Sequence, residues 1–383
     1  MVQPIRVAFN GSALLSPLTG IGQYSKSLAE QLRLGQETDL YFFYAAIWSR
    51  DIRTGPIKEI GAIKDLIKAF VPQPYRVSRG IQQWRFSRGT NAIRPHIYHE
   101  PNFIPFRFDG PTVITAHDLS WIRFPETHPG ERVAVMTKAF PRALEAAHHV
   151  LTDAAYVRQE IIDQFGISPE RITSVPLGAR SIFRPRSEAT CAPVLSKLGL
   201  QYRQYVLCVG TLEPRKNLEL AIRAYAALPP AFRDRYPMVT VGMKGWLTSK
   251  LESVMQPLVA SGELRPLGFT SDETLASLYA GALVLIYPSL YEGFGLPPLE
   301  AMASGTPVIV SNRSTLPEVV GDAGVIIDAE DELGLRQALL RLVEDPGFWN
   351  ERVSASLKQA ERFSWQRCAD QTLAVYRKVL AES

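Results

Sequence analysis

Short apolar runs alternate with longer amphipathic segments along the chain. The apolar run "IRVAF" at 5–9 is followed by a glycine-bearing loop and by "QYSKSLAEQL", whose apolar residues have helical spacing. The same order returns at 205–210, where "YVLCVG" precedes a short loop and the segment "NLELAIRAYAAL", which Asn217 is placed to cap. Each of these units predicts a strand, a loop and a helix.

Five further apolar runs extend the pattern through both halves of the chain. They are "TVITA", "HVLT", "MVTVG", "LVLIYPS" and "TPVIVS", and helical segments separate them. Such alternation is typical of parallel sheets that helices cover on both faces. Because 383 residues exceed what one hydrophobic core usually organises, we expect an α/β protein with two Rossmann-like, doubly wound domains that face a central cleft.

A change in composition marks the expected domain boundary. The stretch "SIFRPRSEATCAPVLSKLGLQ" mixes proline, charged and small residues. We therefore predict an N-terminal domain at 1–190 and a C-terminal domain at 191–364. A last helix at 365–383 is expected to pack back on the N-terminal domain.

The overall composition is that of an ordinary soluble globular protein, with 46% hydrophobic and 21% charged residues. No uninterrupted apolar run reaches the roughly 18 residues of a membrane span, and the N-terminal residues lack the pattern of a signal peptide. We therefore expect a cytoplasmic protein. The three cysteines lack the CxxC spacing of a zinc site and are expected to be reduced structural thiols.

Positive charge is concentrated in the first half of the chain. Residues 1–185 carry 22 Lys and Arg against 16 Asp and Glu, whereas the remainder carries 20 against 22. Part of the excess lies in "IKEIGAIKDLIKAFV", where apolar residues from Ile57 to Phe70 have helical spacing. Basic groups around an apolar stripe favour a helix on the anionic inner surface of a membrane. A domain helix with solvated lysines explains the same pattern.

Three loops that follow apolar runs carry the candidate chemistry. Ligands of open parallel sheets bind beyond the carboxyl ends of the strands, which directs attention to 19–22, 213–216 and 292–300. In the last of these loops, Gly293 and Gly295 let backbone amides approach a ligand. A helix that begins beside such a loop is an anion-binding element.

Charged side chains bracket this expected anion site. Glu292 and Glu300 stand at its two ends, and ionised carboxylates accept hydrogen bonds strongly from hydroxyl groups. Arg215 and Lys216 follow the first strand of the same domain and would meet a phosphate from the other side. The pattern predicts a ligand with hydroxyl groups at both ends and phosphate between them. Because the chain contains no Asp-x-Asp, we expect the two cations to replace a metal.

Three motifs of the second half resemble those of the retaining glycosyltransferases of family 4, also called group 1, which have the GT-B fold. The motifs are "GTLEPRKNL", "EGFGLPPLEAMASGTPVIVS" and "LPEVVGDAGVIID", and the spacing of Glu292 and Glu300 matches the E-x7-E motif of that family. In the first half the resemblance rests on "TGIGQYS", "TAHDLS" and "SVPLGA". It implies retaining, metal-independent transfer of a sugar from a nucleoside diphosphate to an acceptor hydroxyl.

The resemblance also implies roles for individual residues of the second domain, which would bind the donor. Glu300 would hold the ribose hydroxyls, and Arg215 and Lys216 would hold the diphosphate. Glu292 would bind the hydroxyls of the donor sugar. The amides that assist it belong to Gly293, Phe294 and Gly295.

The first domain would bring the acceptor. Gly20 and Gly22 would let its first loop approach the diphosphate, with Gly22 also near the acceptor. His117 would face the donor sugar or its reacting centre. Asp118 would orient the neighbouring backbone, and Asn102 would contact the acceptor with it.

Two further segments point to the kind of sugar. "YHEPNFIP" resembles the H-x-P-N-F stretch of mannosyl- and rhamnosyl-type members, and "VGMKGW" has counterparts in the same group. The resemblance thus implies a GDP-mannose-like donor and a glycan or lipid-linked glycan acceptor in polysaccharide or O-antigen assembly. Neither a cofactor other than this co-substrate nor a nucleic-acid partner is expected.

Other interpretations of the same residues stay open. The glycine pair could form an ordinary turn, and His117 could be an interior histidine. The two glutamates could favour a helix start through the macrodipole alone, and Arg215 and Lys216 could belong to an ordinary solvated loop. A nucleotide-sugar epimerase or a glycosyl phosphorylase of similar architecture would be an enzyme of another class. A non-catalytic nucleotide-sugar-binding subunit is the remaining alternative.

Overall fold

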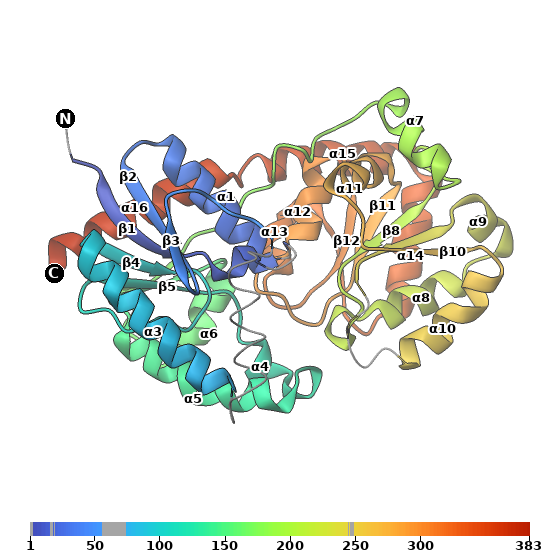
Figure 1. Cartoon of the computed structure of the whole chain (residues 1–383). Coiled ribbons are helices and arrows are strands. Elements are labelled where there is room, and N and C mark those ends of the chain that lie inside the picture. The colour runs from blue at the N-terminus through green and yellow to red at the C-terminus, as the bar shows by residue number, and fades with distance from the viewer. Residues whose placement is uncertain (1–2, 16–17, 19, 56–73, 244, 246–248) are drawn as a thin grey trace. The chain divides into compact units, whose positions relative to one another are not determined.

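The computed structural model describes residues 3–15, 18, 20–55, 74–243, 245 and 249–383 (Figure 1). The segment from Ile57 to Phe70, for which a membrane-surface helix was considered, lies outside these residues, as does Thr19. By their contacts the described residues form two compact units. Unit 1 holds those of 1–118, 134–177 and 365–383, and unit 2 holds 119–133 and 178–364. The predicted limits at 190 and 364 remain predictions.

A seven-stranded sheet forms the centre of unit 1, in the order β3-β2-β1-β4-β5-β6-β7. Its neighbours pair in parallel except β2 and β3, which pair in antiparallel fashion. The strands are β1 (Ile5–Asn10), β2 (Thr38–Tyr44), β3 (Ile47–Ser49), β4 (Ile97–Glu100), β5 (Thr112–Ala116), β6 (His149–Thr152) and β7 (Ile172–Ser174).

Helices follow most strands of this sheet, as the alternating pattern predicts. They are η1 (Ser12–Leu15), α1 (Gly20–Leu34), α3 (Pro74–Ile93), α5 (Gly130–Ala146), α6 (Ala155–Phe165), η3 (Pro169–Arg171) and α16 (Trp365–Glu382). Within unit 1, α16 lies beside α1. Tyr376 of α16 reaches the sheet, where its hydroxyl lies 2.6 Å from Nδ1 of His99 on β4.

Unit 2 contains a six-stranded sheet in the order β10-β9-β8-β11-β12-β13, and each neighbouring pair is parallel. The strands are β8 (Val206–Val209), β9 (Met238–Val241), β10 (Leu264–Gly268), β11 (Val284–Tyr287), β12 (Val308–Ser311) and β13 (Val325–Ile327). From β8 the chain moves outward to β9 and β10, and it then returns to place β11 on the other side of β8. The strand order therefore reverses between β8 and β11, which is where open sheets bind ligands.

Helices lie on both faces of this sheet (Figure 1). On one face α8 packs against α10 and α14, and on the other α11 packs against α7 and α12. The helices of unit 2 are α4 (Ser120–Arg123), η2 (Pro125–Thr127), α7 (Glu188–Lys197), η4 (Pro214–Lys216), α8 (Leu218–Ala226), α9 (Pro230–Arg235), α10 (Ser249–Ala260), α11 (Asp272–Gly281), α12 (Leu296–Ala303), α13 (Leu316–Val320), η5 (Gly321–Ala323), α14 (Glu332–Glu344) and α15 (Pro346–Ala360).

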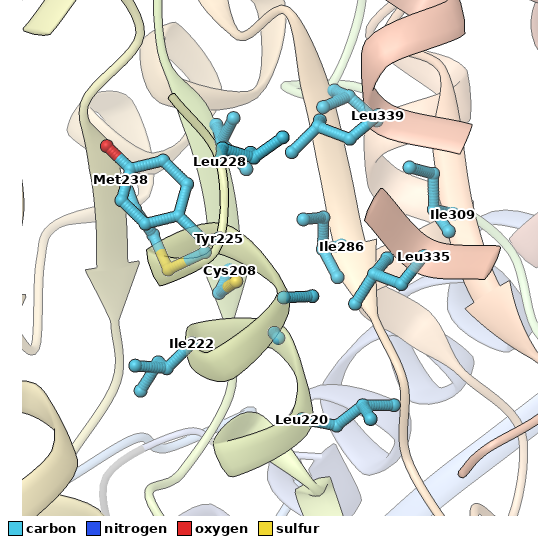
Figure 2. Close-up of a cluster of buried hydrophobic side chains, with 14 of the residues drawn as sticks. Cys208, Leu220, Ile222, Tyr225, Leu228, Met238, Ile286, Ile309, Leu335 and Leu339 are labelled. Carbon is cyan, nitrogen blue, oxygen red and sulfur yellow. The ribbon is translucent and has the colours of Figure 1, made fainter. Parts of the chain in front are cut away.

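Apolar residues at helical spacing fill the space between α8 and the sheet (Figure 2). Leu220, Ile222 and Tyr225 of α8 are buried with Ile286 of β11 and Leu339 of α14. This packing explains why "NLELAIRAYAAL" forms a helix at this position, since most of its apolar residues face one core. The two-sheet α/β prediction is confirmed. Among the described residues, none of the helices combines the length and apolarity required to cross a membrane.

Candidate active site

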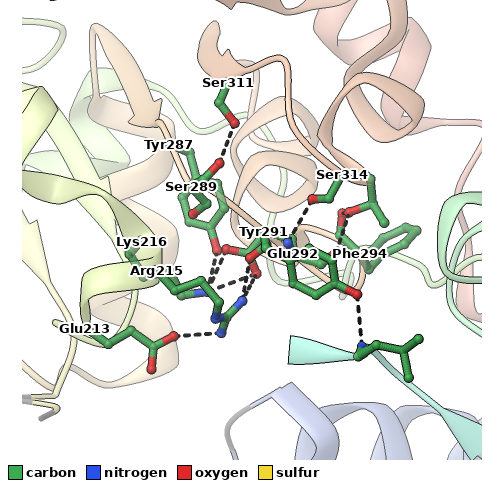
Figure 3. A network of polar contacts seen from close by, with 12 residues as sticks. Glu213, Arg215, Lys216, Tyr287, Ser289, Tyr291, Glu292, Phe294, Ser311 and Ser314 are labelled. Atoms are coloured by element: carbon green, nitrogen blue, oxygen red, sulfur yellow. Dashed lines mark hydrogen bonds and ion pairs between the residues drawn. The ribbon is translucent and has the colours of Figure 1, made fainter. Parts of the chain in front are cut away.

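Two loops at the reversal point of unit 2 bring Lys216 and Glu292 together (Figure 3). Lys216 follows β8 and Glu292 follows β11, so their positions beside each other follow from the pairing of these strands. Lys216 Nζ donates hydrogen bonds to Glu292 Oε1 at 2.7 Å and to Oε2 at 2.9 Å. The hydroxyl of Tyr287 lies 3.1 Å from the same ammonium nitrogen. Lys216 is thus held over the carboxyl end of β11.

Arg215 joins the same network through three contacts. Its Nη2 donates to Glu213 Oε1 at 2.6 Å, and its Nη1 donates to the backbone oxygen of Tyr291 at 2.5 Å and to Glu292 Oε2 at 3.5 Å. The amide of Leu290 in turn donates to the backbone oxygen of Arg215 at 2.8 Å. Arg215 therefore ties the loop after β8 to the loop after β11.

Asn217 shows how this loop is fixed at its end. It occupies the N-cap position of α8 with a φ of 53°, but its side chain makes no capping hydrogen bond. The side-chain nitrogen Nδ2 of Asn217 instead donates to the backbone oxygens of Pro288 at 3.1 Å and Ala329 at 2.8 Å. Asn217 is thus the N-cap residue, as predicted, but its side chain joins three loops at the carboxyl edge of the sheet instead of capping the helix.

The carboxyl of Glu292 is ionised over the ordinary pH range. Burial alone would raise its pKa, but the charges of Lys216 and Arg215 outweigh burial and lower the pKa to about 2. Two cations and two carboxylates, including Glu213, thus form one compact network. Glu213 was not singled out in the sequence, although its place two residues before Arg215 is the signal that could have drawn attention to it.

The turn after Glu292 is held by the loop that follows β12. The amide of Glu292 donates to Ser314 Oγ at 2.8 Å, and Thr315 Oγ1 lies 2.6 Å from the backbone oxygen of Phe294 and 3.3 Å from that of Glu292. Gly295 has a φ of 114° and directly precedes α12. This conformation favours glycine, and a Cβ there would also lie 3.0 Å from Leu316 Cδ2.

The backbone amides expected to bind the donor belong to the 293–295 turn. This turn lies at the N-terminus of α12, an eight-residue helix. The ring of Phe294 is buried and packs 5.8 Å, between ring centroids, from Phe363. Its backbone is therefore what it can offer a ligand.

Glu300, at the other end of the motif, lies in a separate polar cluster. The hydroxyl of Tyr279 donates to its Oε2 at 3.2 Å, and Arg180 Nε lies 3.9 Å from its Oε1. Arg180 also makes a two-pronged ion pair with Asp272, at 2.6 and 3.0 Å. Burial raises the pKa of Glu300 to about 7, although the charge of Arg180 opposes the rise. The sequence did not single out Arg180.

A small hollow lies at the carboxyl ends of β8, β9 and β11, and Lys216 forms part of its wall. Gly210 and Thr211 line it from the loop after β8, and Tyr287 lines it from the end of β11. The loop after β9 closes against this wall, since a Cβ on Gly242 would fall 1.9 Å from the backbone oxygen of Gly210. Lys216 thus shares the wall of the hollow with the start of the loop after β8.

In unit 1, His117 and Asp153 lie side by side. They directly follow β5 and β6, whose last residues, Ala116 and Thr152, are paired. Nδ1 of His117 lies 2.7 Å from Asp153 Oδ2, and its Nε2 lies 2.8 Å from the backbone oxygen of Pro101. Asp153 was not among the residues singled out in the sequence.

The other expected residues of unit 1 have mixed settings. Gly20 begins α1 in open space, whereas a Cβ on Gly22 would lie 3.1 Å from Leu18 Cδ2, so close packing already explains that glycine. The amide of Asn102 donates to Glu100 Oε1 at 3.1 Å, and the Asn102 side chain is exposed. Asp118 is the residue after His117, at the same edge of the sheet.

Two family models match the chain. The model described as glycosyl transferases group 1 matches residues 197–362, and the model described as glycosyltransferase family 4 matches residues 19–180. The O-antigen chain mannosyltransferase B of Escherichia coli is 38% identical over 381 residues, which cover 97% of this chain and 100% of that protein.

Solved structures share the fold at lower identity. Sucrose-phosphate synthase of Thermosynechococcus elongatus aligns with a TM-score of 0.77 and 20% identity, over 99% of this chain and 100% of that one. HepE of Anabaena, solved with UDP-glucose, aligns with a TM-score of 0.71 and 18% identity, over 99% and 100%. The fold is thus that of the GT-B class. The chain belongs to the group 1 glycosyltransferases of family 4, as its motifs predicted.

Proposed function

We propose that the chain is a retaining, metal-independent mannosyltransferase that takes mannose from a GDP-linked donor to a glycan or lipid-linked glycan in O-antigen assembly. The observation that carries the proposal is the 38% identity to an O-antigen chain mannosyltransferase along nearly the whole chain. It is supported by the paired charges at the reversal point of unit 2, which suit a diphosphate and sugar hydroxyls.

Leaving-group stabilisation would be the main source of catalysis. As the bond between sugar and diphosphate breaks, negative charge develops on the phosphate oxygens. Lys216 and the amides of the 293–295 turn are the groups that would meet this charge. Because Lys216 Nζ is shared with both oxygens of Glu292, the diphosphate would compete with that carboxylate for the ammonium group. An incoming donor would thus leave Glu292 with acceptor capacity for sugar hydroxyls.

Arg215 would act differently from Lys216. Its guanidinium already bonds to Glu213 and to the backbone of Tyr291, so its first contribution would be to hold the two loops in register. Glu300 would accept hydrogen bonds from the ribose. Its pKa of about 7 means that this acceptor capacity would grow as the pH rises through neutrality.

Association with an anionic membrane surface is part of the proposal. Helix α3 contains four arginines and no acidic residue. Its exposed face includes Ile81 and Trp84, which is 60% exposed, and Arg88 lies over the Trp84 ring at 5.7 Å. Aromatic and basic side chains together are typical of membrane interfaces. Trp84→Ala should weaken binding to phosphatidylglycerol vesicles, whereas Leu34→Ala, at another exposed apolar position, should not. Equal binding of the two variants to the vesicles would contradict the proposed membrane association.

A direct assay tests the main proposal. The purified chain is incubated with GDP-mannose and a mannose-terminated, lipid-linked acceptor in excess chelator, and released GDP and the product linkage are measured. We expect GDP release that depends on the acceptor, and an α-linked mannose in the product. Loss of activity in chelator would contradict metal independence, and a β-linkage would contradict retention. Conversion of the sugar while it remains on the nucleotide would favour an epimerase, and donor binding without turnover would favour a binding subunit.

A further inference from the structure

Both ring nitrogens of His117 face oxygen atoms: the Pro101 carbonyl can only accept a hydrogen bond, and the Asp153 carboxyl accepts one whenever it is ionised. Nδ1 lies 2.7 Å from a carboxylate oxygen of Asp153, and Nε2 lies 2.8 Å from the backbone oxygen of Pro101. A neutral imidazole carries one N–H and one lone pair. If the single proton were on Nδ1, the lone pair of Nε2 would face the lone pairs of a carbonyl at hydrogen-bond distance. The geometry therefore requires a proton on Nε2 as well as one between Nδ1 and Asp153.

We propose that Asp153 is a positioning residue that keeps His117 in the imidazolium form, with the Nε2 proton held ready for a ligand oxygen. The role of His117 toward a bound sugar donor rests on the proposed function, whereas its protonation state does not. Asp153 is assigned no contact with substrate. It acts through His117, which is fixed at both ends before a donor arrives.

The surroundings of the pair favour this state. Asp153 and His117 are both buried, and Oδ1 of Asp153 has no hydrogen-bond partner among the described residues. The charge of that carboxylate is therefore balanced mainly by the imidazolium, and loss of the ring proton would leave a buried, uncompensated anion, which is costly. Packing restrains the ring too, since the rings of Tyr24 and Phe103 meet it edge-on at centroid distances of 4.9 and 5.6 Å.

Other titratable groups near the pair do not replace this partnership. Asp118 adds a second negative charge that also favours the protonated ring. Burial lowers the pKa of His99, on β4, to about 3, so that histidine is neutral. Burial raises the pKa of Cys368 above its usual range, and that of Tyr24 as well. Burial also lowers the pKa of His117, but Asp153 outweighs it and the net pKa is raised.

The assignment limits what His117 can do. An Nε2 that carries a proton cannot remove one, so His117 is not a general base at this nitrogen. It can donate a hydrogen bond to a hydroxyl of the donor sugar or to a phosphate oxygen. The new hydrogen bond would replace the one from Nε2 to the Pro101 carbonyl. No proton is transferred in this step, and the pair stays neutral as a whole.

Histidine-selective ¹⁵N NMR of the wild-type chain tests the protonation state without any substrate. The chain has six histidines, and His117→Gln identifies the signals of His117 by their loss. We expect both ring nitrogens to be protonated at pH 7.5. A signal of an unprotonated nitrogen at either position would overturn the proposal. Because this measurement uses the wild-type chain and needs no turnover, it decides the inference even if the proposed transfer reaction is wrong.

Asp153→Asn tests the positioning role through its pH dependence. The amide keeps the shape but removes the charge, so the buried ring should become neutral near pH 8 and protonate again at lower pH. We expect the kcat of the variant to be about 30-fold below wild type at pH 8 and within about 5-fold at pH 6, since each pKa unit changes the protonated fraction about tenfold. Asp163→Asn, at an exposed position on α6, should match wild type at both values. A ratio of variant to wild type that is the same at every pH would overturn the proposal.

Discussion

The two carboxylates of the E-x7-E motif are equally buried but differ in charge state. Glu292 is 7% exposed and Glu300 is 8% exposed. The pKa of Glu292 is lowered to about 2, because Lys216 and Arg215 outweigh burial, whereas the pKa of Glu300 is raised to about 7 by burial. Burial is thus common to both, and the nearby cations make the difference.

The difference separates two tasks within one short stretch. Glu292 lies at the reversal point, where the loop after β8 supplies an ammonium group in direct contact with both of its oxygens. Glu300 lies within α12, where its cation is a guanidinium nitrogen at 3.9 Å that Asp272 already neutralises in part. A fixed anion stands beside the expected diphosphate, and a group that titrates near neutrality stands at the expected ribose.

Removal of Lys216 is expected to have the largest effect on this contrast. Lys216→Ala should lower kcat by about 10²–10³, the usual loss for one group that stabilises a developing anion. The substitution also removes the main charge that lowers the pKa of Glu292. Lys250→Ala, which removes an exposed lysine of the same unit, is the control in steady-state assays. Wild-type turnover in Lys216→Ala would exclude the diphosphate role.

Replacing each carboxylate by an amide should change stability in opposite directions at pH 8. The raised pKa of Glu300 means that the unfolded chain releases this proton more readily, so its contribution to stability is present at low pH and lost as the pH rises through about 7. Glu300→Gln should therefore stabilise the fold by about 2 kcal/mol at pH 8, and by less at pH 5.

The contribution of Glu292 has the opposite pH dependence. Its lowered pKa gives stability that is present above the unfolded value of 4.5 and lost as the pH falls toward 2. Glu292→Gln should destabilise the fold by about 3 kcal/mol at pH 8, because a buried ion pair loses one partner. Urea unfolding of both variants at pH 5 and pH 8 checks the pair of predictions. Changes of the same sign at pH 8 would show that charge does not distinguish the two sites.

A smaller effect is expected when Arg180 is replaced, and this substitution tests the cation beside Glu300. Arg180→Gln removes the charge that opposes the rise in the pKa of Glu300, so the carboxylate should be more protonated at pH 7.5. We expect KM for the donor to rise about 3- to 10-fold at that pH, which corresponds to at most about one pKa unit, and to approach wild type at pH 9. The control is Arg186→Gln, which breaks an ion pair with Glu273 on α11, the helix that also carries Asp272. This variant should lack the pH dependence.

The sequence predicted the fold because about half of the described strands coincide with short runs that are mainly apolar and were recognised as such. β5, β6 and β12 are buried along their whole length, so their runs stand out without any knowledge of pairing. β4 reads "IYHE" and β10 reads "LRPLG". These strands were not singled out because polar residues or proline interrupt their apolar runs. The strands that pair with them are far away in the sequence, so the pattern gives no local sign of the pairing.

For the site, the sequence predicted what lies directly after strands and missed what reaches it from elsewhere. Lys216 and Glu292 follow neighbouring strands, so they meet as soon as the sheet forms. Arg180 and Thr315 act through contacts made only after helices and loops pack. Asp153 is an instructive omission, because "TVITAH" and "HVLTD" end alike and strand pairing alone would have placed His117 beside Asp153.

Helix α16 has a consequence for the order in which the protein can mature during synthesis. Trp365, Cys368 and Tyr376 are buried within unit 1, so the first sheet lacks part of its core until the ribosome has made the entire second sheet. At typical elongation rates of about 5–20 residues per second, the N-terminal strands wait at least several seconds for this helix. During that interval His99 lacks its partner Tyr376. Chaperone binding to the nascent chain would therefore be most valuable before α16 has been synthesised.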